Sequence, residues 1–245
     1  MRYISSVLAV AILAVGAHDI LTPEQVITAM HDRYAGNWYH TLTMEQQGIA
    51  HKPDGTIATA ARHETILPPG RLRIDFGDRS AGNGFLFANG HEYIFHDGKL
   101  AKDLDRLNPL LVLGYDIYCQ SPAATIASLK QLHFDLSVIH EEDWEGRPAY
   151  VIGANAGDTH TSQFWIDKER LYFLRLLAPD EKDPKLTQDI RFEDYKQVES
   201  GWLAEHVLFY SDGKLVFEEK YSPAQINLAV GEDLFDPEHF VKTAR

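Results

Sequence analysis

The stretch QFWIDKERLYFLRLL, residues 163–177, contains two apolar runs on either side of the polar residues 167–170. Short runs of aromatic, aliphatic and β-branched residues around a polar turn are typical of a β-hairpin rather than a helix. A sheet with one solvated face alternates apolar and polar residues, whereas these runs are apolar at nearly every position. We therefore expect both faces of this hairpin to be covered, and the function depends on what covers the second face.

Most of the remaining chain shows the period-two pattern and the turn signals of antiparallel strands. No helical segments alternate regularly with the strands, so a doubly wound α/β fold is excluded. The sequence predicts a mainly β (α+β) fold: a single, strongly curved antiparallel sheet of about ten or eleven strands, forming a half-barrel. The further strands are expected at 38–49, 56–67, 71–76, 85–95 (a hairpin about Asn89-Gly90), 136–140, 148–154, 190–198, 202–210 and 215–221.

Three helices are expected beside this sheet. Thr22 is a predicted N-cap, Pro23 takes the first helical position, and Gln25 completes a capping box for an amphipathic helix that ends near Gly36. Asn108-Pro109 and Ser121-Pro122 begin two short apolar helices, inserted between strands. We expect the inserted segment 109–132 to pack on one face of the sheet as a lid. The charged segment 178–188 is predicted to be a loop.

The first residues resemble a secretory signal peptide. Met1-Arg2 is followed by a mostly apolar run over 3–15 and by small residues ending at Ala17, and the run is too short for a convincing membrane span. We expect a signal peptide at 1–17 and one exported, periplasmic domain at 18–245, with an uncleaved anchor as the alternative. No cysteine lies at the predicted cleavage site, so the protein is not expected to be a lipoprotein. Cys119 is the single cysteine and cannot form an internal disulfide.

The charge balance narrows the class of partner. Lys and Arg total 23 against 36 Asp and Glu, giving a formal net charge of −13. This balance argues against nucleic acid or an anionic bilayer as the main partner. We expect no nucleic-acid partner, and we expect a monomer.

The inner wall of a curved sheet has more apolar side chains than one short helix pair needs for cover. Two interpretations follow: an ordinary dry core, or a cavity under a movable lid that a lipid-like chain fills. Burial contributes about 25 cal/mol per Å2, so an acyl chain could gain several kcal/mol. The residues expected to line such a cavity are Phe76, Phe85, Phe87, Tyr93, Phe95, Leu110, Leu111, Leu113, Trp165 and Phe173.

Several short motifs resemble the outer-membrane lipoprotein-sorting family, the LolA-like proteins. They are Pro69-Gly70-Arg71-Leu72-Arg73, Gly146-Arg147-Pro148-Ala149-Tyr150, Trp165-Ile166-Asp167, Phe192-x-x-Tyr195, and the closing Ile226-Asn227 and Leu234-Phe235, together with the inserted helices. The resemblance covers nearly all of the chain after the leader. It implies a half-barrel closed by helices, which in the best-known members holds lipoprotein acyl chains in transit across the periplasm.

One departure concerns the lid. Leu67 stands where the best-known carrier has a lid-locking arginine before the proline of the third strand. Arg71 or Arg73 could supply this guanidinium from further along the chain and donate hydrogen bonds to carbonyl groups of the lid. The alternative is that each is an ordinary arginine on the protein surface. The resemblance therefore indicates a divergent member.

Other chemistry has little support in the sequence. Twelve histidines include His91 and His96 in one predicted hairpin, but no metal-binding helix motif such as H-E-x-x-H is present. A G-x-S-x-G elbow is absent, and Cys119 has no evident paired base, so a small buried thiol is favoured. We expect no enzyme activity, metal or cofactor.

The leading hypothesis is a periplasmic carrier for lipids or lipoprotein acyl chains, served by a membrane-bound donor and acceptor. The alternatives are an envelope sensor or assembly module that binds a protein partner and, less favoured, a hydrolase or metal enzyme.

Overall fold

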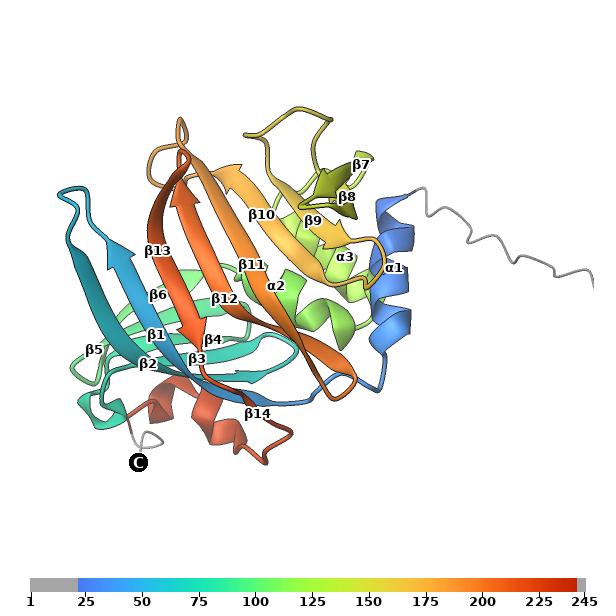
Figure 1. Cartoon of the computed structure of the whole chain (residues 1–245). Coiled ribbons are helices and arrows are strands. Elements are labelled where there is room, and N and C mark those ends of the chain that lie inside the picture. Colours follow the sequence, from blue (N-terminus) through green and yellow to red (C-terminus); the bar gives the residue numbers. More distant parts are fainter. Residues whose placement is uncertain (1–21, 242–245) are drawn as a thin grey trace, which may run out of the picture.

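The computed structural model describes residues 22–241, which form one open antiparallel sheet around a few helices (Figure 1). The helices are α1 (Pro23–Tyr34), α2 (Pro109–Gly114) and α3 (Pro122–Gln131), with 3-10 turns η1 (Arg79–Ala81), η2 (Asp116–Tyr118), η3 (Glu232–Phe235) and η4 (Pro237–His239). The strands are β1 (Leu42–His51), β2 (Ile57–Leu67), β3 (Arg71–Phe76), β4 (Gly84–Ala88), β5 (His91–His96), β6 (Lys99–Asp105), β7 (Ile139–Trp144), β8 (Arg147–Ile152), β9 (Gln163–Asp167), β10 (Phe173–Pro179), β11 (Thr187–Val198), β12 (Gly201–Ser211), β13 (Lys214–Tyr221) and β14 (Gln225–Ile226).

The predicted single antiparallel sheet is confirmed. Its order is β6-β5-β4-β3-β2-β1-β13-β12-β11-β10-β9-β8-β7, and β14 pairs with β1 beside this path. The two halves of the chain therefore join through the β1–β13 pair, and the sheet curves around α2 and α3 (Figure 1). The sheet has 14 strands rather than ten or eleven. The prediction missed β6, because this edge strand is almost wholly exposed and carries no buried alternation, and it missed β14, which is only two residues long.

All three predicted helices are present, and their start signals act as expected. The Thr22 hydroxyl accepts from the Gln25 amide while the Gln25 side chain accepts from the Thr22 amide, completing the capping box. Asn108 and Ser121 cap α2 and α3. The charged loop is shorter than predicted, because β10 continues to Pro179 and β11 begins at Thr187.

The hairpin of β9 and β10 is covered on both faces. The Asp167 carboxylate fixes its turn by accepting the amides of Glu169 and Arg170 at 3.0 and 2.7 Å. On the inner face, Phe164 packs edge-on against Phe134, which follows α3. On the outer face, Trp165 is shielded by side chains of the sheet itself rather than by a helix.

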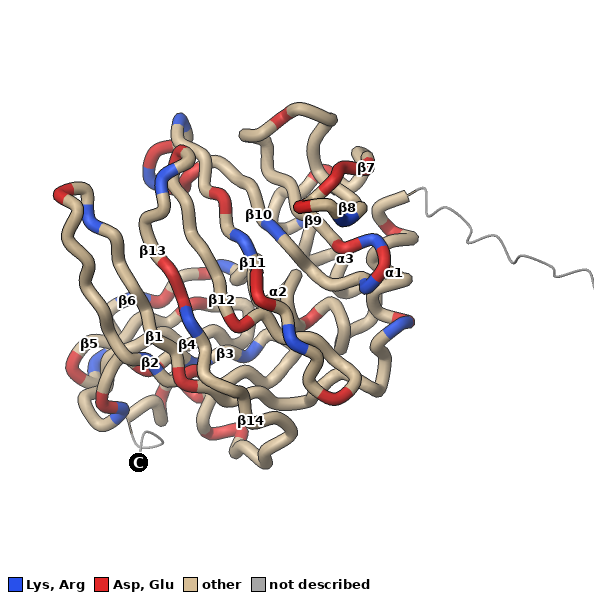
Figure 2. Tube along the Cα trace, in the orientation of Figure 1, with Lys and Arg blue, Asp and Glu red and all other residues tan. Residues whose placement is uncertain are grey.

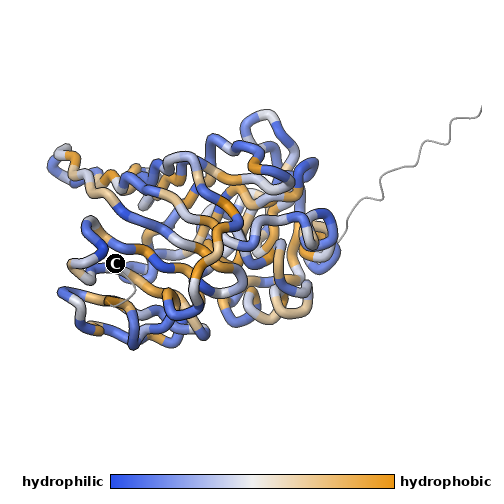
Figure 3. The backbone as a smooth tube through the Cα atoms, turned by 90° about the horizontal axis from the view of Figure 1, so that it is seen from below, coloured by the Kyte–Doolittle hydropathy of each residue, from blue (hydrophilic) through white to orange (hydrophobic). Residues whose placement is uncertain are grey.

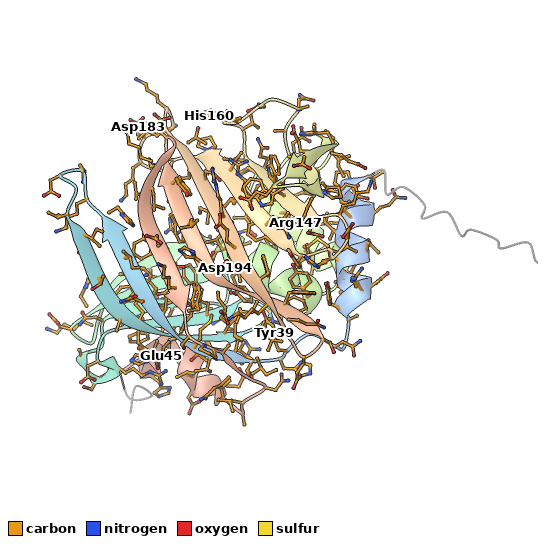
Figure 4. All side chains as sticks on the ribbon, viewed as in Figure 1. Tyr39, Glu45, Arg147, His160, Asp183 and Asp194 are labelled. Atoms are coloured by element: carbon orange, nitrogen blue, oxygen red, sulfur yellow. The ribbon has the colours of Figure 1, made fainter. Side chains whose placement is uncertain are left out.

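A joint between α1 and the sheet closes one end of the core. The Trp38 ring stacks on Tyr118 of η2 with 3.9 Å between centroids, and Tyr34 of α1 meets both rings edge-on. Tyr39, labelled in Figure 4, precedes β1 and lies beside the first residues of β12, where its hydroxyl donates to the Trp202 carbonyl. Three residues of α2 and all three of η2 are buried, whereas only Thr125 and Leu129 of α3 are.

A second, smaller core lies on the outer face of β3–β5. It consists of Leu86, Ala88 and Phe95 from the sheet and of Phe235 and Phe240 from the C-terminal segment. The Phe95 and Phe240 rings stack with 4.0 Å between centroids. The C-terminal segment thus covers the face of the sheet opposite to the helices.

The distribution of charged and apolar residues agrees with this arrangement of sheet, helices and C-terminal segment. Basic and acidic residues are interspersed along the strands and loops (Figure 2), while apolar residues concentrate in the middle of the molecule (Figure 3). Over residues 22–241, no helix is long and apolar enough to cross a membrane. The predicted signal peptide at 1–17 lies outside the described residues.

Candidate functional site

A hollow of about 210 Å3 lies between α2 and the inner face of the sheet. It is bounded by β2–β5 on one side and by β11–β13 on the other, with α2 as its roof. Its apolar lining residues are Leu72, Ile74, Phe85, Phe87, Leu110, Leu111, Phe192 and Phe209. Its polar lining residues are Arg62, Glu64, Glu92, Asn108, Tyr115, Glu219 and Tyr221.

Strand register places these side chains on one face. Ile74 pairs with Glu64 on one side and Phe85 on the other, and Leu72 pairs with Phe87. Residues directly opposite each other in neighbouring strands project from the same face of a sheet. The inner wall is therefore a set of cross-strand rows, each running over several strands.

The lid is held over this wall by polar contacts as well as by packing. Asn108 accepts the amides of Leu110 and Leu111 and so orients the two leucines that form the roof. The Asp116 carboxylate accepts the Gly70 amide at 2.9 Å, and the Tyr118 hydroxyl accepts the Phe173 amide at 3.0 Å. Burial raises the pKa of Asp116 to about 7, although the Gly70 amide and Arg71 oppose that rise.

The structure brings part of the predicted cavity lining together. Phe85, Phe87, Leu110 and Leu111 all line the hollow. Phe76 lies beside them, edge-on to Phe85 with 4.8 Å between ring centroids. Leu113 and Phe173 are fully buried in the main core, where helix and sheet meet without a gap, and neither lines the hollow.

Three of the predicted lining residues lie on the opposite face of the sheet, which corrects their assignment. Tyr93 and Phe95 belong to the outer core under the C-terminal segment, and Trp165 packs outside against Trp144 and Arg175. Hydrophobicity alone does not distinguish the two faces. In the two-residue hairpin about Asn89-Gly90, Tyr93 pairs with Leu86 and so points away from Phe85 and Phe87.

The predicted lid contacts of Arg71 and Arg73 are also corrected. Arg71 forms an ion pair with Glu232 of η3. Arg73 is buried on the outer face, where it binds the Asp75 carboxylate and donates to the Leu234 and Phe240 carbonyls. Both arginines anchor the C-terminal segment, and the lid is instead held near Gly70 by Asp116.

A buried polar cluster on the inner wall was not predicted. Arg62 Nη1 lies 3.3 Å from Glu219 Oε1, and its guanidinium lies over the rings of Phe76 and Phe217. The Tyr221 hydroxyl donates to Glu219 Oε2 at 2.8 Å. The available signal was the parity of the strand 56–67, because Arg62 and Glu64 share a face with the fully buried Ile66.

Glu64 differs from its neighbours in this cluster. Its side chain is only 4 % exposed, and its Oε2 atom has no hydrogen-bond partner. Burial, followed by the charge of Glu219, raises the pKa of Glu64 to about 8. Burial also raises the pKa of Glu219. Glu64 is therefore largely protonated in the hollow at neutral pH.

The candidate groups for other chemistry are not assembled into a centre. Cys119 is exposed rather than buried as predicted. Desolvation of the sulfur and the charge of Asp116 raise its pKa to about 12, which keeps it a weakly nucleophilic thiol. Within residues 22–241, no three His, Cys, Asp or Glu side chains are grouped to hold a metal ion.

Comparison with solved structures identifies the fold. A domain from Vibrio parahaemolyticus described as an outer membrane lipoprotein-sorting protein domain has a TM-score of 0.60 and 14% identity, covering 89% of this chain and 97% of that one. The chain has a LolA-like fold. A LolA superfamily protein from Nitrosomonas europaea has a TM-score of 0.55 and 12% identity over 89% and 99% of the two chains.

A DUF1329 family protein from Desulfovibrio piger is similar to the same degree as the Vibrio domain, with a TM-score of 0.60 and 13% identity over 89% of this chain and 97% of that one. No family model and no curated protein matches the sequence. The predicted resemblance is thus confirmed for the LolA-like fold, at 12% to 14% sequence identity.

Proposed function

We propose that this protein is an exported, periplasmic binding protein or carrier that holds an apolar chain of a lipid or lipoprotein in the hollow beneath α2. The observation that carries this proposal is the hollow itself: eight apolar side chains from sheet and lid surround a space of about 210 Å3. The LolA-like fold of the neighbouring structures supports the same function.

The size of the hollow implies that the lid moves on binding. Pockets for small-molecule ligands usually measure about 300–1,000 Å3, so the hollow in its present form accepts only part of a long chain. Its roof is the single short helix α2, and the Asp116–Gly70 hydrogen bond is the polar contact that holds the following turn to the β2–β3 connection. Displacing α2 would enlarge the hollow while the joint at Tyr118 stays in place, and a bound chain would offset the exposure of apolar surface.

A matched pair of leucine substitutions tests the proposal. Leu110 lies on the roof of the hollow, whereas Leu100 is 51 % exposed on β6. Leu110→Trp should fill the hollow and weaken saturable binding of the neutral fluorophore N-phenylnaphthylamine at least about tenfold, equivalent to ~1.4 kcal/mol. Leu100→Trp should bind like the wild type. Absence of saturable binding, or equal loss in both variants, would refute a binding site under α2.

A further inference from the structure

The carboxyl groups that line the hollow outnumber the cations that pair with them. Arg62 pairs with Glu219, and Arg106 Nε lies 2.6 Å from Glu92 Oε2. Glu64 is the third carboxyl of this lining and has no ion pair within residues 22–241. Three carboxyl groups thus line one small, mostly apolar space whose lining contains one guanidinium group, that of Arg62. Arg106 reaches Glu92 from outside this lining, with a side chain that is 43% exposed.

The geometry also leaves a specific acceptor open. Arg62 and Tyr221 occupy both oxygens of Glu219, and Gln46 donates to Tyr221 at 3.1 Å. By contrast, Glu64 Oε2 is buried without a partner, although a buried polar atom normally has one. Because a carboxylate accepts hydrogen bonds and carries negative charge, the complementary group is a donor with positive charge.

We propose that the hollow recognises an apolar chain that ends in a protonated primary amine, with the ammonium group bound to the Glu64 carboxylate. This inference rests on the proposed binding function and adds the chemistry of the head group. The ammonium would give every carboxylate of the hollow one cation, while the apolar wall around Phe85 and Leu110 would hold the chain. An anionic head group would instead meet three carboxyl groups.

Recognition of an ammonium requires that Glu64 be ionised in the complex. Burial makes the neutral acid the favoured form in the empty hollow at neutral pH, so binding should release about one proton to solvent. The other titratable or charged groups that face Glu64 across the hollow are Arg62, Glu92, Tyr115, Glu219 and Tyr221. Among these, the tyrosines Tyr115 and Tyr221 have pKa values raised well above their usual range, so they stay neutral.

Four probes with the same alkyl chain separate the possible head groups: dodecylamine, dodecyltrimethylammonium, dodecanol and dodecanoate. Displacement of N-phenylnaphthylamine from the full chain at neutral pH gives the affinities. Dodecylamine should bind about tenfold tighter than each other probe, the difference expected for one hydrogen bond to a charged group. Calorimetry in buffers of different ionisation enthalpy should detect the released proton.

The variant Glu64→Gln should lose most of the amine preference and the proton release, while it binds dodecanol as before, which shows that it is folded. The control Glu45→Gln changes a 62 % exposed carboxylate of β1 (Figure 4) and should behave like the wild type. Equal or tighter binding of dodecanoate, dodecanol or the trimethylammonium probe, or an unchanged amine preference in Glu64→Gln, would overturn the inference. Failure of all four probes to bind would instead overturn the binding function itself.

Discussion

At the scale of single residues, this protein places charged groups where apolar ones are expected, on both faces of its sheet. Arg62, Glu64 and Glu219 lie on the inner wall, and Arg73 with Asp75 lies under the C-terminal segment. Sequence alone showed that these residues belong to strands. It did not show their distant partners: Arg62 and Glu219 are 157 positions apart in the chain, and Arg73 and Phe240 are 167 positions apart.

Glu64 predicts a measurable dependence of stability on pH. Its pKa is raised from 4.5 to about 8 on folding, so between these values the folded chain keeps a proton that the unfolded chain releases. The contribution of Glu64 to stability is therefore greatest below pH 4.5 and is lost as the pH rises to about 8, by up to ~1.4 kcal/mol per pH unit. Urea unfolding of Glu64→Gln should show a smaller decline over this window than the wild type. A parallel decline in both proteins would contradict the burial of an ionisable Glu64.

The two arginines of the β3 entry should differ in their effect on stability. Arg73 is 1 % exposed and pairs with the buried Asp75, so Arg73→Ala should cost about 3–5 kcal/mol in the free energy of unfolding by removing the closer of the two cations beside that carboxylate. The other cation, Arg79, lies 3.8 Å from Asp75 Oδ2. Arg71 pairs with an exposed Glu232, and Arg71→Ala should cost about 0–1 kcal/mol. Denaturant titration of both variants checks this difference, and similar losses would show that the buried pair is not important.

At the scale of elements, the sequence signals for helix ends were reliable. The assignment of strand residues to one or the other face of the sheet was not. The caps at Thr22, Asn108 and Ser121 mark the three helices correctly, since a cap depends on residues within one turn. The edge strand β6 was missed because it has few apolar residues in an alternating pattern. Tyr93 was placed on the wrong face because its hydrophobicity does not show to which face of the strand its side chain points. Counting residues across the Asn89-Gly90 turn would have corrected the second error.

The lid should open locally when its polar contact is removed. Asp116→Ala deletes the acceptor of the Gly70 amide and leaves the packing of Tyr118 intact. We expect hydrogen exchange across α2 and η2 to accelerate several-fold, equivalent to roughly 1 kcal/mol for one hydrogen bond. Exchange in β12 should stay unchanged.

Asp135→Ala, in the exposed turn after α3, is the control for this exchange experiment and should leave the exchange of α2 as it is in the wild type. Uniform acceleration throughout the Asp116→Ala chain would indicate global destabilisation instead of lid opening.

At the scale of the whole molecule, the sheet has two covers with different roles. The C-terminal segment packs on the outer face of β3–β5, where Phe95 stacks on Phe240. The lid closes the inner face but leaves the hollow between α2 and the wall. The overall half-barrel was predictable from strand pattern and topology. The division of its inner wall into a sealed part and a hollow part depends on side-chain volumes from seven strands, β2–β5 and β11–β13, which no local pattern specifies.

Photolabelling tests whether an apolar chain binds beneath α2, because it locates the bound chain on the protein. A dodecanol with a diazirine in the middle of its chain would be irradiated with the full chain, and the labelled peptides would be mapped by mass spectrometry. We expect saturable labelling of peptides from β3, β4 and α2, abolished by excess dodecanol and by Leu110→Trp. Labelling confined to the outer face or to the C-terminal segment, or labelling that never saturates, would contradict this expectation.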